Sequence, residues 1–389
     1  MWQHDDCGCG GKGPSLERLI ALAREQNLPT VGVKPAQFSA TLKGRVEWAL
    51  INRDGITERQ GKGPNLILDQ GLDQVAAHPL RARAAGNNMP TSGWFPIIGY
   101  AAVGTDNTAP AAGQTGLGAE VGRTTARFAS DVIARPANGV YEFTKSIEFD
   151  YGFGNGNLVE WGFSFASAAG GNLFNRALFL DGGGSPEVVT KTDEFKLRLI
   201  YTLEVALSPV ALTSGVFDIA GVGTRNGSYA LVGGPPPSTP SGSVCQSPDL
   251  VLFSALARGE LLTVAGASGT PETASIRVRD VDLSDVAYTD SLSYTNDNSA
   301  RSVARLIDTE RDAYVPGAFE RTGGVWKFDT DAGNLANVHG FALGGASWTG
   351  EPICHRHGYV FALDASDEFE KDDEHTLTIG VPTVTWGRA

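Results

Sequence analysis

Alternation of apolar and polar residues is the dominant pattern along this chain. Between positions 38 and 50, apolar residues recur at every second position and charged residues such as Lys43, Arg45 and Glu47 fall between them. The longest alternating run extends from Phe195 to Leu207. A period of two is that of a β-strand, whose successive side chains point to opposite faces. Strands with one apolar face are typical of antiparallel sheets, so we expect a mainly β protein.

Turns and breaks divide these strands. Asn52-Arg53-Asp54-Gly55 follows the first alternating run and predicts a hairpin turn. The glycine-rich stretch from Gly152 to Asn157 resembles a phosphate-binding loop, but no helix follows it, so we interpret it as a turn. The apolar runs at 250–256 and 261–264 are candidate strands, and the last strand, from Leu377 to Trp386, is broken at Pro382.

A few segments have helical spacing instead. Ser15 can cap a helix that continues to Asn27, and a short helix is expected from about residue 69 to His78. Further helices are predicted over about 115–130 and 299–311. The predicted fold is thus two tandem antiparallel β-sandwich-like domains with short helices and an N-terminal helical arm.

The two halves of the chain repeat the same phrases in the same order. Gly156-Asn157-Leu158 has a counterpart in Gly333-Asn334-Leu335, and the stretch Thr192–Leu197 has one in Asp373–Thr378. An ordered repeat of this kind indicates an internal duplication. We therefore expect three parts: an N-terminal Cys/Gly-rich arm with a short helix at 1–30, a β domain at 31–208, and a second β domain, a divergent duplicate, at 209–389.

Composition and charge exclude several kinds of partner. The formal net charge is −13, and no basic cluster is present that could neutralise phosphates, so neither nucleic acid nor an anionic membrane is an expected partner. The start is acidic where a secretion signal would be basic and then apolar. We expect synthesis in a cytoplasm, where the four cysteines are thiols or metal ligands. No Gly-x-Ser-x-Gly elbow or persuasive Ser/His/Asp set occurs, so we do not expect an enzyme.

Three phrases in the first half carry a resemblance. They are Leu42–Arg45 continuing through the turn to Asn65–Asp73, then Val103–Pro110 with Gln114, Thr115, Leu117 and Glu120, and then Val159–Phe163 with Gly170–Ala177 and Val189–Asp193. Together they resemble a loose group of tailed-bacteriophage virion structural proteins, found among tail, fibre-adaptor and head-associated β proteins. The resemblance implies a β-rich fold that works in assembly or host contact, and it brings no catalytic residues. It covers about 40–205, and residues 210–389 lack the Asn-Leu-Ile-Leu-Asp-Gln-Gly-Leu phrase.

One cluster has the residue types of a metal site. In Cys354-His355-Arg356-His357, alternation along a strand would place His355 and His357 on the same face, where they could share a structural zinc ion. The alternative is a solvated histidine pair beside a buried cysteine. No other cofactor is expected.

The N-terminal arm offers candidate partner contacts. Cys7 and Cys9 are too close together for a standard zinc knuckle, and Leu16 and Leu19 share one face of the predicted helix. These four residues could contact another chain, or the helix could pack on its own domain.

From these observations we expect a non-enzymatic structural component of a tailed phage particle, located in the virion after assembly in the host cytoplasm. The expected role is that of a tail or fibre-adaptor protein that forms homo-oligomers and contacts other virion proteins. The alternatives are a head decoration or vertex protein, or a carbohydrate-binding module that attaches to a host surface glycan. Exposed aromatic residues such as Trp94 or Trp348 along a groove would favour the glycan-binding alternative.

The zinc hypothesis leads to a direct prediction. The purified protein should contain zinc by elemental analysis, and replacing both His355 and His357 by Ala should release it, because two of the ligands are lost. Wild-type protein without metal would rule the site out.

Overall fold

The computed structural model describes residues 37–80, 95–220, 222–234, 247–259, 273–279, 283–290, 313–322, 325–328, 335–346, 355–374, 377–380 and 382–389. Contacts divide the chain into two units, residues 1–34 and 35–389, and every described residue belongs to the second unit. Strands hold 51% of the residues and helices 9%, which confirms the predicted mainly β class. The helical arm at 1–30 and the helix at 299–311 lie outside the described residues.

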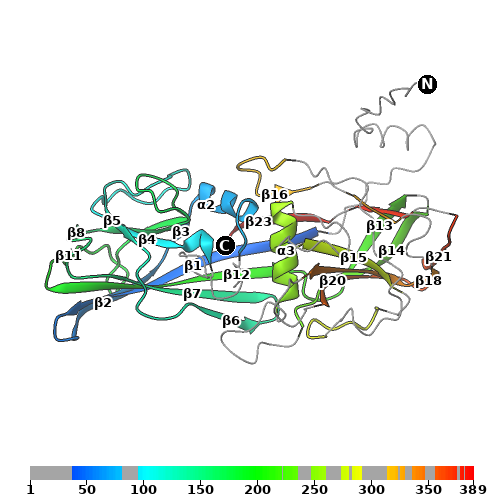
Figure 1. The fold of residues 1–389 in the computed structure, drawn as a ribbon, viewed down its shortest axis with the longest axis horizontal. Helices are drawn as coiled ribbons and strands as arrows, with labels where there is room; N and C mark the ends of the chain where they lie inside the picture. The colour runs from blue at the N-terminus through cyan, green and yellow to red at the C-terminus, as the bar shows by residue number, and fades with distance from the viewer. Residues whose placement is uncertain are drawn as a thin grey trace, which may run out of the picture. The chain divides into compact units, whose positions relative to one another are not determined.

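The longest strand, β1 (Gln37–Asn52), has neighbours along both edges. β12 (Phe195–Ser208) pairs antiparallel with it, β2 (Thr57–Pro64) covers the C-terminal half of its other edge, and β23 (Thr383–Arg388) runs parallel to the N-terminal half. The sheet is completed by β7 (Val140–Phe149), β6 (Val132–Ala137) and β16 (Glu320–Arg321). Figure 1 shows β1, β12 and β7 side by side.

The predicted hairpin between β1 and β2 is confirmed. The Asn52 side-chain oxygen accepts bonds from the backbone N–H groups of Asp54 and Ile56, and Gly55 adopts a φ of 79°. A left-handed residue is needed at that point of the turn, and glycine adopts this conformation without steric strain. The register of β1 then buries alternate residues from Phe38 to Leu50, as the sequence pattern predicts.

A second sheet faces the first across a shared core. Its strand order is β3 (Leu66–Ile67), β10 (Asn175–Leu178), β9 (Glu160–Ser164), β4 (Tyr100–Gly104) and β5 (Glu120–Thr124). Side chains of the two sheets meet between them: the Phe163 and Tyr201 rings stack with centroids 4.5 Å apart. A separate pair, β8 (Gly156–Leu158) with β11 (Val189–Lys191), lies beside these sheets, and a 3-10 turn, η2 (Pro96–Ile98), precedes β4.

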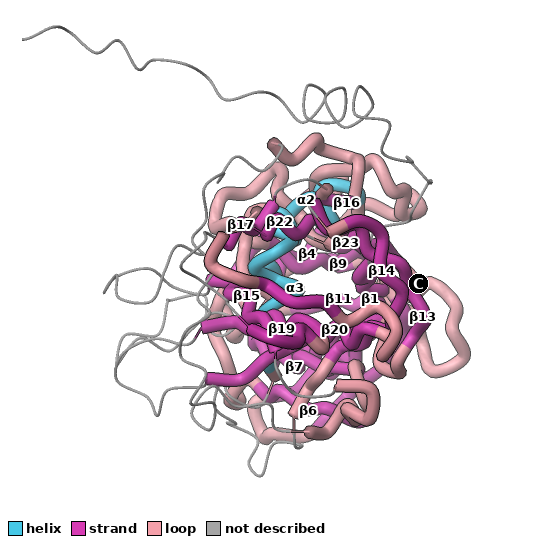
Figure 2. The backbone as a smooth tube through the Cα atoms, turned by 90° about the vertical axis from the view of Figure 1, so that its right-hand side faces the viewer, coloured by secondary structure: helices cyan, strands magenta, loops and turns pink. Residues whose placement is uncertain are grey.

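The rest of the chain forms a seven-stranded sheet. Its order is β15 (Thr273–Arg279), β19 (Gly340–Ala346), β20 (His355–Leu363), β14 (Gly223–Leu231), β13 (Thr213–Ala220), β22 (Leu377–Gly380) and β17 (Val325–Phe328). A further pair joins β18 (Leu335–Val338) to β21 (Phe369–Lys371). The helix α3 (Pro248–Arg258) packs against β19 and β20, and its residues from Pro248 to Ala257 are buried (Figure 2).

The order of strand pairings occurs twice. In the first half the order is β7, β12, β1, β2, β3, β10, β9 and β4, where β2 and β3 are separated by Asn65 alone and count as one strand. In the second half the order is β17, β22, β13, β14, β20, β19 and β15. β14 thus corresponds to β2 and β3 together. The small pairs also correspond. Leu158 opposes Val189 and Val338 opposes Phe369, so each partner lies 180 positions after its counterpart, from 158 to 338 and from 189 to 369. This regularity fits the duplication expected from the sequence, but it matches Leu158 with Val338 and not with Leu335, the counterpart expected from the sequence.

The last strand does not stay in the sheet of its own half. Residues 377–388 correspond to the C-terminal twelve residues of β12, but Pro382 divides them into β22 and β23. Proline has no N–H to donate, so a strand is interrupted there. β22 pairs with β13 and β17, whereas β23 joins β1. The division into domains at 208 and 209 stays a prediction, because residues 35–389 form one contact unit.

The helices of the two halves occupy equivalent places and contact each other. A short helix, α2 (Asp69–Asp73), with the 3-10 turn η1 (Gln74–Ala76), follows β3, and α3 follows β14. Asp69 and Asp249 stand 180 positions apart, and each reaches the other half: Asp69 forms an ion pair with Arg388, and Asp249 accepts a bond from Tyr141. The predicted short helix near 69–78 is therefore confirmed.

Two predicted elements are wrong. The segment 115–130 contains β5 and irregular backbone in place of a helix, because Gly116, Gly118 and Gly122 weaken a helix and strand β4 offers a pairing edge. The run 250–256 is helical in α3, not a strand. A short apolar run does not distinguish the two states, and the helix signals lie in its flanks, with Pro248 in the first turn and Gly259 at φ 76° after the last.

The position of β23 predicts that both halves unfold together. Trp386 is 4% exposed and its indole N–H donates to the Leu72 carbonyl at 2.8 Å. Replacing Trp386 by Ala should lower the free energy of unfolding by about 3–5 kcal/mol, since it leaves a cavity and an unpaired carbonyl. Denaturant unfolding should keep one transition. Thr383→Ala, in the same strand and half-buried, is the control; a second transition in the Trp386 variant would contradict the shared strand.

Candidate functional site

The three phrases of the phage resemblance meet at one place in the fold. The 105–119 loop, which connects β4 to β5, has no regular secondary structure. Loops of this length inside a compact unit are usually functional or disordered. The 105–119 loop is held in one conformation, because side chains from all three phrases bind its backbone.

A buried ion pair between Glu160 on β9 and Arg176 on β10 holds the 105–119 loop, and we call this pair the anchor. Both side chains are 0% exposed, and Arg176 Nε lies 2.7 Å from Glu160 Oε2. A carboxylate without water must have all its oxygens bonded. Glu160 meets this condition, because Oε1 accepts from the Asp106 and Ala119 N–H groups and Oε2 accepts from that of Gly118.

Arg176 holds the middle and the start of the loop. Its Nη1 donates to Gln114 Oε1 at 2.9 Å, and its Nη2 pairs with Asp106 Oδ2 at 3.1 Å. The fixed fork of a guanidinium suits three simultaneous acceptors. Gly104 makes room for this arrangement, since a Cβ there would lie 2.5 Å from Glu160 Oε1. The conformation of the loop is therefore set by buried charges at its start, middle and end.

The first phrase contributes contacts from α2. Gln70 Nε2 donates to the Thr115 carbonyl at 2.5 Å and to the Leu173 carbonyl at 2.8 Å, while the Asp69 N–H donates to the Ala112 carbonyl at 2.9 Å. Leu117, in the loop, is buried in a small apolar cluster with Leu68 and Leu173. The phrases thus form one structural unit, although no signal in their spacing predicts which side chains bond.

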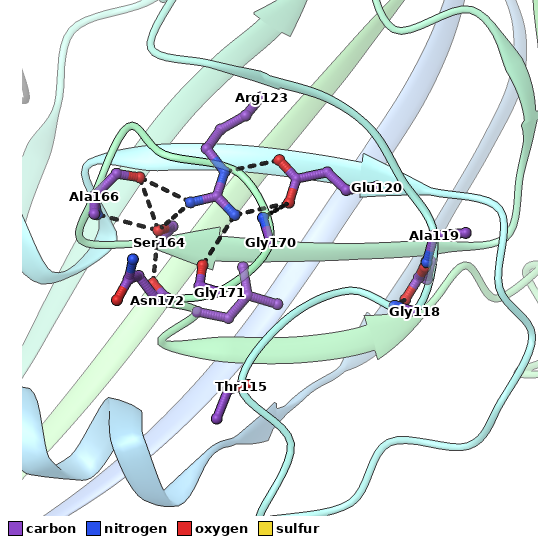
Figure 3. A network of polar contacts seen from close by, with 12 residues as sticks. Thr115, Gly118, Ala119, Glu120, Arg123, Ser164, Ala166, Gly170, Gly171 and Asn172 are labelled. Carbon is purple, nitrogen blue, oxygen red and sulfur yellow. Dashed lines mark hydrogen bonds and ion pairs between the residues drawn. The ribbon is translucent and has the colours of Figure 1, made fainter.

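A second network fixes the neighbouring loop, residues 165–172 (Figure 3). Arg123 on β5 binds both oxygens of Glu120 at 2.8–2.9 Å, and it donates to Ser164 Oγ at 2.8 Å. It also donates to the carbonyls of Ala166 and Gly171. The two loops touch at Gly116, where an added Cβ would lie 3.4 Å from Gly170. We call residues 105–119 and 165–172 together the loop platform.

The outer residues of the loop platform are small and uncharged. Exposed positions are Thr105, Asn107, Thr108, Ala109, Ala111, Gly113, Thr115, Gly118, Ala119, Ser167, Ala168, Ala169 and Gly170. Asp106 is the one ionisable residue of the platform, and Arg176 binds it. The exposed residues of the platform therefore carry no ionisable side chain. The fixed conformation favours binding, because a loop held in one conformation loses little entropy when a partner docks.

A buried cluster elsewhere joins the halves. The Asp249 carboxylate accepts from Tyr141 at 2.6 Å and from Tyr288 at 2.7 Å, and burial raises the pKa of Asp249 above its ordinary value. Burial also raises the pKa of both tyrosines, and the nearby Asp249 charge is the second cause of this increase. Arg135 lies over the Tyr288 ring and donates to the Gly233 and Gly234 carbonyls. With Asp249 and Tyr141 inaccessible to solvent, we assign this cluster a structural role.

The described residues do not test the site residues predicted from sequence. Cys7, Cys9, Leu16, Leu19 and Cys354 lie outside the described residues. His355 and His357 begin β20, where they oppose Ala346 and Gly344, but only their backbone is described. Among the side chains that the structure describes, no three His, Cys, Asp or Glu residues gather as metal ligands. The zinc site stays a prediction.

Neither a membrane-spanning helix among the described residues nor a similar known protein was found. In the described parts of the chain, no helix has the length and apolar character that crossing a membrane requires. No family model matches the chain, and no curated protein or solved structure is significantly similar to it.

The buried ion pair gives a quantitative prediction. Arg176→Met leaves the Glu160 carboxylate buried without its counter-charge, so the free energy of unfolding should fall by about 3–5 kcal/mol. The control is the same substitution at Arg45, whose side chain is 51% exposed and pairs with Glu142; it should change stability by about 1 kcal/mol or less. Adding Glu160→Gln to Arg176→Met should recover part of the loss. Equal effects of the two Arg→Met changes in chemical denaturation would count against the anchor.

Proposed function

We propose that this chain is a non-enzymatic structural component of a tailed phage particle, a tail or fibre-adaptor protein that acts by symmetric assembly. The observation that carries the proposal is the convergence of the three resembling phrases on the loop platform. The first and third phrases are tens of residues away from the second along the chain, yet their side chains bond to the loop that the second phrase forms, which supports treating the three as one structural unit. The two tandem β domains expected from the sequence would form its scaffold.

The surface of the loop platform suits a protein partner. Its exposed side chains are small, so another backbone can approach closely, and its conformation is already fixed before contact. In this proposal the platform contacts other virion proteins or further copies of this chain. Location in the virion, and a head decoration or vertex role as the alternative position, belong to the same proposal.

The three tryptophans whose side chains the structure describes do not support the carbohydrate-binding alternative. Trp48, Trp161 and Trp386 are 0–4% exposed and cannot stack on a sugar. Trp94 and Trp348, which could line a groove, lie outside the described residues. A host glycan is therefore not proposed as the partner.

The test is immunogold electron microscopy on particles produced from the genome that carries this gene, with peptide mass spectrometry of the same particles. Label at one fixed position on the tail is expected. Label at the head or a vertex would select the alternative position. Purified particles that contain neither label nor peptides of this chain would refute the proposal.

Complementation with a platform variant tests the role of the loops. Ala109→Arg places a long charged side chain on the exposed platform and should prevent incorporation into particles, while the unfolding transition of the purified protein stays unchanged. Ser185→Arg, at an exposed turn outside the platform, is the matched control and should be incorporated normally. Equal incorporation of both variants would remove the platform from the assembly surface.

A further inference from the structure

A buried lysine faces a side-chain amide next to the second sheet. Lys191, the last residue of β11, is 1% exposed, and its Nζ lies 2.7 Å from Asn155 Oδ1. Asn155 belongs to the turn after β7, the Gly152–Asn157 stretch interpreted from sequence as a turn. The Nδ2 group of Asn155 donates to the Asp193 carboxylate. The amine therefore contacts the carboxamide, and the carboxamide contacts the carboxylate.

The other contacts of Lys191 orient the amine. Its Nζ donates to the Asp150 carbonyl at 2.7 Å and to the Tyr151 carbonyl at 3.3 Å. These two carbonyls hold two N–H bonds, so the third direction of Nζ is the one that faces Asn155. If the ammonium loses the proton that it donates to Asn155 Oδ1, the free electron pair lies on the Asn155 side of Nζ, and Cγ is the atom bonded to that oxygen. A positioned nucleophile beside its target gains a large rate advantage over the same groups free in solution.

The electrostatics of the site favour the free amine. Burial lowers the pKa of Lys191 to about 8, and the nearby Asp193 and Asp150 oppose part of that shift. An amine with this pKa is partly unprotonated near neutral pH, which an exposed lysine is not.

We propose that Lys191 and Asn155 form an intramolecular isopeptide bond. The Lys191 Nζ attacks Asn155 Cγ and forms a C–N bond; the Cγ–Nδ2 bond breaks and ammonia leaves. One proton passes from Nζ to the departing Nδ2, and we assign this transfer to Asp193, which accepts a bond from Nδ2 and whose charge acts on Lys191. No electron is gained or lost, and no co-reactant is required. Asp193 acts here as the general acid–base group.

The bond would fix the scaffold of the loop platform. It closes the chain between residues 155 and 191, a segment that contains β9 with Glu160 and β10 with Arg176. A cross-link that closes a loop of this length restricts the unfolded chain and stabilises the folded one. The inference rests on the contacts of Lys191 alone and holds whether or not the protein belongs to a phage particle.

Mass spectrometry of the intact full-length protein tests the bond. The expected mass is that of the sequence less one ammonia, and a tryptic digest should contain the Asn155 peptide joined to the Lys191 peptide. Lys191→Arg keeps the charge but should restore the full mass. Asp193→Asn should leave most of the protein unlinked. Asn157→Ala is the control, because that side chain bonds Thr190 and not Lys191, and it should stay linked.

Two results would overturn the proposal. One is a wild-type protein of full mass with no joined peptide. The other is an ammonia loss that persists in Lys191→Arg, which would assign it to succinimide formation at Asn155-Gly156. The linked wild type should also melt about 5 °C above the Asn155→Ala variant, as expected for a cross-link of this loop length in a large chain.

Discussion

The fold depends on one strand, β1, whose two edges take partners from distant parts of the chain. Along one edge it pairs over fourteen positions with β12, and along the other it accepts β2 and, in the opposite direction, β23. Backbone groups in a core must find partners, and β1 would otherwise leave half of one edge unpaired. Because β23 supplies those bonds from the end of the described chain, the halves cannot be separated without exposing that edge.

The helices reinforce this arrangement through polar contacts. Asp69 begins α2 and Asp249 lies in the first turn of α3, and they bond to the opposite half through Arg388 and Tyr141, respectively. Leu80, in the segment that follows η1, donates its N–H to the Ser254 hydroxyl of α3. A helix such as α3, buried on all sides, is stable only because residues of both halves surround it.

The sequence is informative where period and turn chemistry agree, and ambiguous where tertiary partners decide. Alternation identifies β1 and β12, and Asn52 with Gly55 identifies the hairpin between β1 and β2, since these signals are local. The failures have tertiary causes. Residues 250–256 are apolar because the helix is surrounded, so no period of 3.6 remains to be seen. The segment 120–124 is extended because β4 offers hydrogen bonds that its own sequence does not require.

The candidate site shows the same limit in another form. Glu160, Arg176 and Gln114 belong to the three phrases of the resemblance. A charged residue on the buried face of a strand, however, breaks the apolar–polar alternation, and the sequence does not reveal its partner. Nothing in the spacing relates Glu160 to the N–H groups of Gly118 and Ala119, more than forty residues earlier. Arg123 is not part of any phrase, although it determines the second loop of the platform.

The two halves of the chain differ at the position of the buried Glu160. At the start of β9 the first half has Glu160, opposite Gly104, whereas at the start of β19 the second half has Gly340, opposite Arg279. Glycine stands at the position of Glu160 in the second half, so the strand order does not need this carboxylate. Burying a charge is costly unless the charge is paired and fully hydrogen-bonded. In this chain Glu160 meets that condition by bonding the loop backbone, so the buried charge and the shape of the loop depend on each other.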